Sequence, residues 1–300
     1  MDLKQLECFV RVAELGSFTK AAAVLGISQP VLSRQVRQLE LELKKHLLYR
    51  NGRGVTPTES GRRLVAHGNG ILHQVELARQ ELEDEEAFPV GKVVIGLPPS
   101  IGKALTVRLV TRFRKLYPKA SVHIVEGLTA SMQEWLQLGR LDIALLYNPV
   151  TTPQLAYEPV RTEDLYLISF GGNRKLRDTV RMADLPRYPL IIPSRPHSIR
   201  SLVEAECGRH GVELNIVLEI DAIASVLDLV EQNAGHAILT RGALHGRARR
   251  SALHAARIVA PGIATQLVIA TSAQRPLTTL AKRTVALIKS ELAEASAAPA

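Results

Sequence analysis

The sequence is poor in cysteine and has no long hydrophobic run. Its 300 residues include only Cys8 and Cys207, which cannot build a disulfide framework and match no zinc-ligand spacing. No stretch of eighteen apolar residues is free of charge, which excludes a membrane-spanning helix. The first residues, MDLKQLECFVRVAE, carry acidic side chains among apolar ones and lack the basic-then-apolar pattern of a secretion signal. We therefore expect a cytoplasmic protein with no membrane partner.

The common motifs of enzymes are also missing. There is no G-x-S-x-G, no H-E-x-x-H, no P-loop and no G-x-G-x-x-G. The histidines of the second half show no spacing that would place several metal ligands on one helix face. We expect no catalytic residues, no metal and no cofactor.

The composition is that of a globular protein, and its charge is unevenly distributed. Apolar residues make up 46% and charged residues 22% of the chain, which excludes a disordered protein and suits two or three compact units. The net charge is +9, but residues 66–90 hold one Arg against six acidic residues. Residues 1–65 hold eleven Lys and Arg against six Asp and Glu. Within the first ninety residues, the positive charge suited to nucleic acid is therefore confined to residues 1–65.

The first segment has the pattern of three short helices. Leu3, Leu6, Phe9, Val10 and Ala13 fall at three- and four-residue spacing and predict one buried stripe of a first helix, which Gly16 ends. Ser17 is placed to cap a second helix that closes at Gly26, and Ser28 is placed to cap a third with Pro30 in its first turn. Two short helices joined by a glycine-containing turn are typical of a helix-turn-helix motif.

The third predicted helix has two different faces. Its apolar face predicts a core stripe of Leu32, Val36, Leu39 and Leu43. The opposite face carries Ser33, Arg34 and Arg37, with Gln29 at the start, and such donors can reach base edges and phosphates. The same face could simply be a solvated charged surface, which is what the helix alone would favour. The preceding helix pair and the basic hairpin LLYRNGRGVTPT that follows favour DNA binding.

These residues resemble the N-terminal domain of LysR-type bacterial transcription regulators. The match runs through LKQLECFVRVAELGSFTKAAAVLGISQPVLSRQVRQLE and LLYRNGRGVTPTESG, and Pro57 departs from the family's usual Leu. The resemblance implies a winged helix-turn-helix whose third helix enters the major groove of double-stranded DNA, at half-sites of an imperfect palindrome. The expected DNA-binding residues are Ser28, Gln29, Pro30, Ser33, Arg34, Arg37 and Arg53.

A long helix is predicted over residues 58–86. Leu64, Ile71 and Ala78 repeat every seven residues, as do Gly68, Val75 and Leu82 between them. The helix could pack on its own domain, but its length and acidity favour a linker that forms dimers, as it does in the family. We therefore expect a homodimer or homotetramer. For a transcription regulator, RNA polymerase is a further expected partner.

The remaining sequence alternates short apolar segments with helical patterns. Strands are predicted at 93–97, 121–127, 143–147, 164–169, 189–194, 214–220, 236–240 and 265–272, and helices at 102–117, 130–139, 198–210, 223–233 and 276–294. This alternation predicts two parallel sheets with covered faces. The resemblance adds that the chain crosses between two lobes near residues 162 and 265, as in periplasmic binding proteins.

The fold class is therefore α/β multidomain, and the resemblance sets its domain limits. We expect a winged helix-turn-helix domain at 1–58, a linker helix at 59–87, a hinge at 88–91 and an effector-binding domain at 92–300. Lobe I would comprise 92–162 and 266–300, and lobe II 163–265. Residues 91–148 are most similar to the nitrogen-assimilation-control branch of the family.

Several hydroxyl side chains follow predicted strands at the start of helices. Such positions attract carboxylates or phosphates, because backbone N–H groups at a helix N-terminus are free. Taken singly, each is better explained as an ordinary helix cap. Taken together with the family's effector cleft, they predict a site for a small anionic effector. The expected effector-binding residues are Ser100, Thr129, Asn148, Ser198 and Thr240.

Two other classes of protein would also fit a two-lobed domain. A cytosolic solute-binding protein would share its shape, but would not carry a helix-turn-helix. An enzyme using the same cleft would need a paired acid and base, whereas the predicted cleft residues are mostly hydroxyls.

Overall fold

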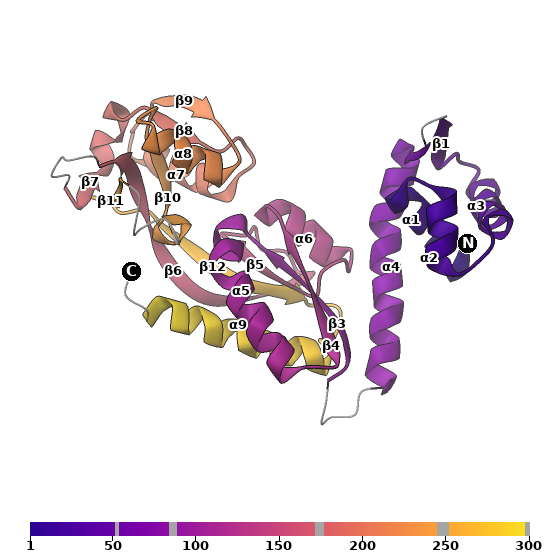
Figure 1. Ribbon diagram of the computed structural model, residues 1–300. Coiled ribbons are helices and arrows are strands. Elements are labelled where there is room, and N and C mark those ends of the chain that lie inside the picture. The colour runs from indigo at the N-terminus through magenta and orange to yellow at the C-terminus, as the bar shows by residue number, and fades with distance from the viewer. Residues whose placement is uncertain (52–53, 84–88, 172–176, 245–251, 298–300) are drawn as a thin grey trace. The chain divides into compact units, whose positions relative to one another are not determined.

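The computed structural model (Figure 1) describes residues 1–51, 54–83, 89–171, 177–244 and 252–297. Two compact units make up the chain. The first is built from Met1–Glu83, and the second contains the remainder of the chain except the turn Leu138–Arg140. No helix in the part of the chain that the structure describes is long and apolar enough to cross a membrane.

The first unit begins with three helices, as predicted. They are α1 (Leu3–Leu15), α2 (Phe18–Leu25) and α3 (Gln29–Leu43). Gly16 and Gly26 end the first two in the left-handed conformation, with φ of 62° and 64°, which glycine adopts without steric cost. Ser17 caps α2, because its hydroxyl accepts a hydrogen bond from the Lys20 N–H at 3.3 Å.

Three details of the predicted helices were wrong. Ser28 stands at the N-cap of α3 but its side chain makes no capping hydrogen bond. Leu3 and Leu43, expected in the core stripes, lie at the helix ends and are 46% and 36% exposed. The interior of the stripes is buried, with Phe9, Leu32, Val36 and Leu39 at 0% exposure, so each helix still packs through one apolar face.

A hairpin and a long helix complete the first unit. Strands β1 (Leu48–Asn51) and β2 (Gly54–Pro57) pair antiparallel, which confirms the predicted hairpin. Helix α4 (Glu59–Glu83) follows, and Thr58 caps it by accepting the Gly61 N–H at 3.0 Å.

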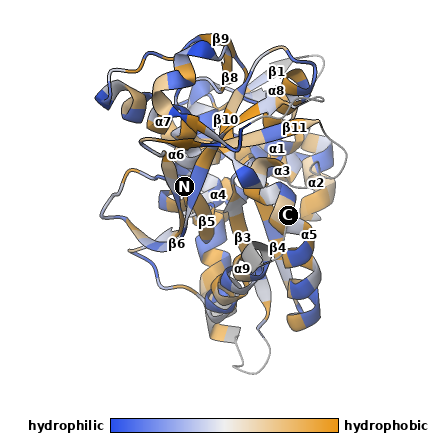
Figure 2. Ribbon diagram, turned by 90° about the vertical axis from the view of Figure 1, so that its left-hand side faces the viewer, coloured by the Kyte–Doolittle hydropathy of each residue, from blue (hydrophilic) through white to orange (hydrophobic). Residues whose placement is uncertain are grey.

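The first lobe of the second unit is a sheet covered on both faces. Figure 1 shows α5 and α9 together beside this sheet. The two helices pack on the side chains of Ile95, Ile143 and Leu145, and α6 packs on the alternate residues Val94 and Ala144. Blue and orange residues alternate along α5 in Figure 2, as expected of a helix with one buried face. The elements are β3 (Gly91–Leu97), α5 (Pro99–Leu116), β4 (Ala120–Glu126), α6 (Thr129–Gln137), β5 (Ile143–Tyr147), β12 (Ala264–Ser272) and α9 (Thr279–Ala297).

The second lobe is formed by most of the segment between β5 and β12, whereas the first half of β6 belongs to the first lobe. Its core includes Leu167, Ile191, Val203, Val230 and Ile238, which come from strands and helices along this whole segment. The elements are β6 (Leu155–Phe170), β7 (Thr179–Arg181), η1 (Met182–Arg187), β8 (Leu190–Ile192), α7 (Ser198–Arg209), β9 (Ile216–Glu219), α8 (Ile223–Glu231), β10 (Ala237–Thr240), η2 (Arg241–Leu244) and β11 (Leu253–Val259).

The sheets are mixed, so the prediction of purely parallel sheets was wrong. Strands β3, β4 and β5 are parallel, but β12 runs antiparallel to β5 and to β6. In the second lobe, β10 and β11 both run antiparallel to β6. Strands β7 and β11, and the first half of β6, were not predicted, because their exposed polar residues interrupt the apolar runs used to find strands.

Strands β6 and β12 join the two lobes. Their pairing runs from Leu155↔Ser272 in the first lobe to Asp164↔Ala264 at the second. Strand β6 then continues and pairs with β10 from Leu165 onward. The two strands lie side by side in Figure 1 and make one path of backbone hydrogen bonds between the lobes.

Two glycines inside helices should respond in opposite ways to the same substitution. A Cβ on Gly61 would lie 2.1 Å from the Leu47 backbone oxygen, whereas a Cβ on Gly208 would meet nothing within 4 Å. We expect Gly61→Ala to destabilise the first unit by about 1–3 kcal/mol. We expect Gly208→Ala, as the matched control, to stabilise α7 by about 0.5–1 kcal/mol. Hydrogen exchange of the amides in α4 and α7 of the whole chain measures both, and equal effects would contradict this account.

Candidate nucleic-acid interface and inter-lobe site

Helix α3 presents a polar, basic face to solvent. Gln29, Pro30, Arg34 and Arg37 are exposed and Ser33 is half-buried, while Leu32, Val36 and Leu39 hold the opposite face in the core. Neither Arg34 nor Arg37 forms an ion pair with another residue in the part of the chain that the structure describes. Their guanidinium groups can therefore donate to a base edge or a phosphate without first breaking an internal contact. Ser28, just before the helix, is also exposed.

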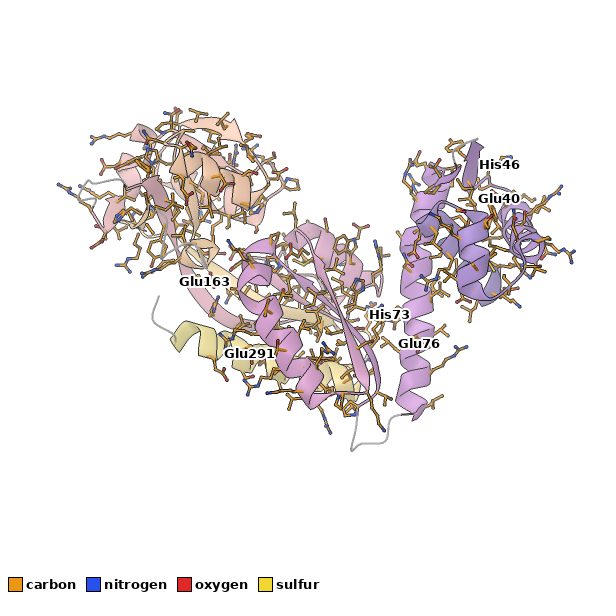
Figure 3. All side chains as sticks on the ribbon, in the orientation of Figure 1. Glu40, His46, His73, Glu76, Glu163 and Glu291 are labelled. Carbon is orange, nitrogen blue, oxygen red and sulfur yellow. The ribbon has the colours of Figure 1, made fainter. Side chains whose placement is uncertain are left out.

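The hairpin is attached firmly to α3 and α4. The Glu40 carboxylate, labelled in Figure 3, accepts the backbone N–H groups of Leu47 at 2.8 Å and Leu48 at 3.3 Å. From the other side, the Thr58 hydroxyl donates to the His46 carbonyl at 2.9 Å. These contacts fix the start of the hairpin relative to the exposed face of α3. Arg53, the predicted contact in the turn, lies outside the described residues.

Sequence reasoning did not assign a role to Glu40. Its side chain acts on the backbone of residues seven and eight positions later, and a helical pattern alone gives no sign of such a contact. Its position near the end of α3, just before a hairpin, was the available signal.

The predicted effector residues lie at or after the end of a strand. In the first lobe, the parallel strands β3, β4 and β5 lead to Ser100, Thr129 and Asn148. In the second lobe, β8 leads to Ser198 in α7, and Thr240 ends β10. Because the carboxyl ends of parallel strands share one edge of a sheet, the first lobe gathers its residues at one edge. In the second lobe, a parallel bridge between Leu190 and His236 aligns β8 with β10, so their carboxyl ends also lie on one side. We call these two edges together the inter-lobe site.

Polar side chains from both edges meet at Tyr147. The Tyr147 hydroxyl donates to the Glu163 carboxylate at 3.1 Å, and the Thr240 hydroxyl lies close enough to the phenol to lower its pKa slightly. Arg161 pairs with the same carboxylate. Burial and the neighbouring Glu163 charge raise the pKa of Tyr147 well above its usual value, so the phenol keeps its proton. These side chains come from β10 of the second lobe, β5 of the first and the shared strand β6, which contains Glu163 (Figure 3).

The side chains of Thr129 and Asn148 form hydrogen bonds with other parts of this chain. The Thr129 hydroxyl donates to the Tyr147 carbonyl at 3.2 Å and accepts the Tyr147 N–H at 3.3 Å. The Asn148 amide donates to the Thr265 hydroxyl at 2.8 Å and its oxygen accepts the Gln266 N–H at 2.8 Å. Both side chains therefore hold the end of β5 in place. Ser100 and Ser198 are half-buried in the first turns of α5 and α7.

The start of α7 is organised by two other polar residues. The His197 imidazole caps the helix by accepting the Ile199 N–H at 3.3 Å, and burial lowers the pKa of His197, which keeps this acceptor neutral. Arg200 is 5% exposed and donates to the Pro193 carbonyl at 3.2 Å. Arg200 is also paired with Glu204 and Glu219, so its charge is used inside the lobe.

The structure thus brings Thr129, Asn148 and Thr240 together around Tyr147. Tyr147, Arg161 and Glu163 were not singled out from the sequence. Tyr147 ends an apolar strand directly before Asn148. An aromatic residue at such a position is usually interpreted as part of the core, and Tyr147 is indeed buried in the core.

A helix-turn-helix with an exposed basic helix, followed by a two-lobed α/β domain, defines a DNA-binding transcription regulator with a ligand-binding domain. Comparison with known families agrees in both parts. Residues 3–62 match the bacterial regulatory helix-turn-helix proteins of the lysR family, and residues 86–293 match the LysR substrate binding domain. The chain belongs to the LysR family of transcriptional regulators.

Named relatives cover most of the chain. It is 31% identical to the nitrogen assimilation regulatory protein nac of Klebsiella aerogenes, over 92% of this chain and 90% of that protein. It is also 31% identical to the transcriptional regulator BbuR of Bordetella bronchiseptica, over 81% of this chain and 75% of that protein. The match to nac confirms the predicted similarity to the nitrogen-assimilation-control branch.

Solved structures share the fold. Full-length OxyR from Pseudomonas aeruginosa, in a substituted form, matches with a TM-score of 0.72 at 21% identity, over 97% of both chains. CbnR, a LysR family transcriptional regulator, matches with a TM-score of 0.71 at 22% identity, over 97% of this chain and 99% of that one. The expected fold class is therefore confirmed.

The exposed arginines of α3 should differ from other surface arginines in their effect on DNA affinity. We expect Arg34→Ala to weaken binding to a duplex selected in vitro by about 1–3 kcal/mol and to relax its sequence preference. Arg11→Ala is the matched control, because Arg11 is an exposed helical arginine that pairs with Glu14 at 3.2 Å. Fluorescence anisotropy on selected and random duplexes measures both. An equal loss on the two duplexes for Arg34→Ala would contradict base reading.

Proposed function

We propose that the protein binds operator DNA as a homodimer or homotetramer and responds to a small anionic metabolite held at the inter-lobe site. The observation that carries the DNA-binding part is the basic face of α3, whose two arginines form no internal ion pair among the described residues. A recognition helix with such a face suits the major groove, and a hairpin beside it suits the phosphate backbone. The proposed DNA contacts are Ser28, Gln29, Pro30, Ser33, Arg34, Arg37 and Arg53.

The chemistry of the inter-lobe site supports an anion. Helices α5, α6 and α7 each begin there, and a helix N-terminus carries free N–H groups and partial positive charge. The Glu163 carboxylate at this site is neutralised by Arg161. In this proposal Ser100, Ser198 and Thr240 contact the effector, and Thr129 and Asn148 hold the strand end against which it lies.

The oligomer is supported by α4. Ile71 is 39% exposed and Leu82 is 90% exposed. Eleven residues are about three helical turns, so both side chains lie on one face of α4, which suits packing against a second copy. A dimer would place two α3 helices on half-sites about one helical turn apart. The domains proposed are 1–58 for DNA binding, 59–87 for dimerisation, and 92–300 for the effector after a hinge at 88–91.

We also propose that the protein acts in the cytoplasm, without a catalytic role and without a cofactor. RNA polymerase is a further proposed partner. The named relatives are transcriptional regulators, which supports a regulator over an enzyme. A two-lobed solute-binding protein of similar shape would have no use for the basic helix α3.

A thermal-shift panel on the full chain tests the effector site. We expect one of a set of small carboxylates, amino acids and phosphates to raise Tm, since a ligand at a hundred times its Kd stabilises the folded state by about 2.7 kcal/mol. Ser100→Ala and Ser198→Ala should remove the shift. Ser201→Ala is the control, because Ser201 lies exposed one turn further along α7. The proposed effector site is contradicted if Ser100→Ala, Ser198→Ala and Ser201→Ala change the Tm shift alike, or if no compound raises Tm.

A further inference from the structure

The start of α5 holds a carboxylate that comes from another strand. Glu126 is the last residue of β4, and it pairs with Leu97, the last residue of β3, just before α5 begins. A Cβ on Gly102 would overlap Glu126 Oε1, so the carboxylate lies against the backbone of α5 at a position that has no side chain. Because Gly102 is two residues after Ser100, this carboxylate belongs to the first-lobe edge of the inter-lobe site.

The protein does not neutralise this carboxylate. Glu126 is exposed and forms no ion pair with any residue that the structure describes. Lys103, the next residue along α5, is exposed and does not pair with it either. A negative charge here repels a simple carboxylate or phosphate that approaches α5, and it attracts an ammonium group. The ligand that suits this edge therefore carries a positive group as well as a negative one.

The second lobe brings a cation to the same end of α5. Arg241 follows Thr240 and begins η2, which contacts α5. Since Thr240 meets Tyr147 at the edge where α5 begins, η2 lies at the start of this helix. Arg241 is exposed, and no residue in the described ranges forms an ion pair with it. A guanidinium group binds a carboxylate through two parallel N–H donors, so Arg241 can hold the negative group of the same ligand.

We propose that the effector is an acidic amino acid, whose ammonium group binds Glu126 and one of whose carboxylates binds Arg241. This inference rests on the proposed function, because it names the class of ligand held at the inter-lobe site. The charges of Glu126 and Arg241 cancel, and Arg161 neutralises Glu163. The starts of α5, α6 and α7 add partial positive charge. A ligand with one ammonium group and two carboxylates matches this balance.

The probes are L-aspartate and L-glutamate, with succinate and glutarate as the counterparts that lack only the ammonium group. Calorimetric titration of the full chain at neutral pH measures all four. We expect at least one of the amino acids to bind about fivefold or more tightly than its counterpart, the effect of one partly exposed ion pair.

Two variants test Glu126 as the source of this preference. Glu126→Gln should weaken binding of the amino acid about fivefold and strengthen binding of its counterpart, because the repulsion is removed. Gly102→Ala should act in the same direction, since its Cβ displaces the carboxylate from α5 without removing the charge. Glu213→Gln is the matched control and should bind as the wild type does. Glu213 is an exposed carboxylate before β9 that forms no ion pair among the described residues.

A third variant tests the carboxylate contact. Arg241→Gln should weaken binding of the amino acid and of its counterpart alike, by about fivefold. Arg114→Gln is its control, because Arg114 is an exposed arginine in the last turn of α5, and it should change neither affinity.

The outcomes separate this proposal from the proposed function. An acidic amino acid is the wrong class if succinate and glutarate bind as tightly as the amino acids, or if Glu126→Gln has no more effect than Glu213→Gln. It is also the wrong class if none of the four probes binds while another compound of the thermal-shift panel raises Tm. In each of these cases the inter-lobe site itself can still stand. If no compound of either set binds, the inter-lobe effector site and its amino-acid ligand are both overturned.

Discussion

The antiparallel pairing of β6 with β12 is the contact on which the second unit depends. Both strands leave the first lobe and reach the second, and their pairing is interrupted by a bulge at Val160, where the register shifts between Leu267 and Val268. In the first lobe, β12 lies between β5 and β6, and in the second lobe β6 pairs with β10 and β11. A change in the angle between the lobes must therefore be absorbed by twisting two paired strands. Paired strands keep their backbone hydrogen bonds when they twist, so the movement is constrained in direction.

The inter-lobe site is built on this pair. Glu163 lies on β6 near the point where the strand enters the second lobe, and Thr265 lies on β12 beside Asn148. Each hydrogen-bonded group at the site is therefore held by backbone whose position is already fixed by the sheets.

Local sequence signals predicted much of the fold. Glycines that end helices, a capping serine and an apolar stripe led to the three helices and the hairpin, because each signal acts within a few residues. Strands with continuous apolar runs, such as residues 143–147, were found for the same reason. The first half of β6 was missed, because an edge strand with one exposed face carries Glu158 and Arg161 where a buried strand would carry apolar residues. The direction of β12 could not be read locally, since it depends on how the chain returns from the second lobe.

The candidate site was only partly accessible to sequence reasoning. Hydroxyl residues at strand ends were found by position, but position does not say whether a hydroxyl faces a ligand or the backbone. Thr129 binds the backbone of Tyr147, and that contact joins residues eighteen positions apart. Glu163 and Tyr147 were missed for the same reason. Their hydrogen bond depends on β5 and β6 both pairing with β12, which is distant in the sequence.

The order of the strands also determines when each part of the chain can fold during synthesis. The helices and hairpin of the first unit lie within residues 3–83, so they are synthesised first. The first lobe, in contrast, lacks an interior strand until residues 264–272 have been made, and one of its covering helices until residue 297. The whole second lobe is synthesised in between. A chain that stops early would therefore carry a complete helix-turn-helix unit on an unfinished sheet, able to occupy DNA but unable to respond.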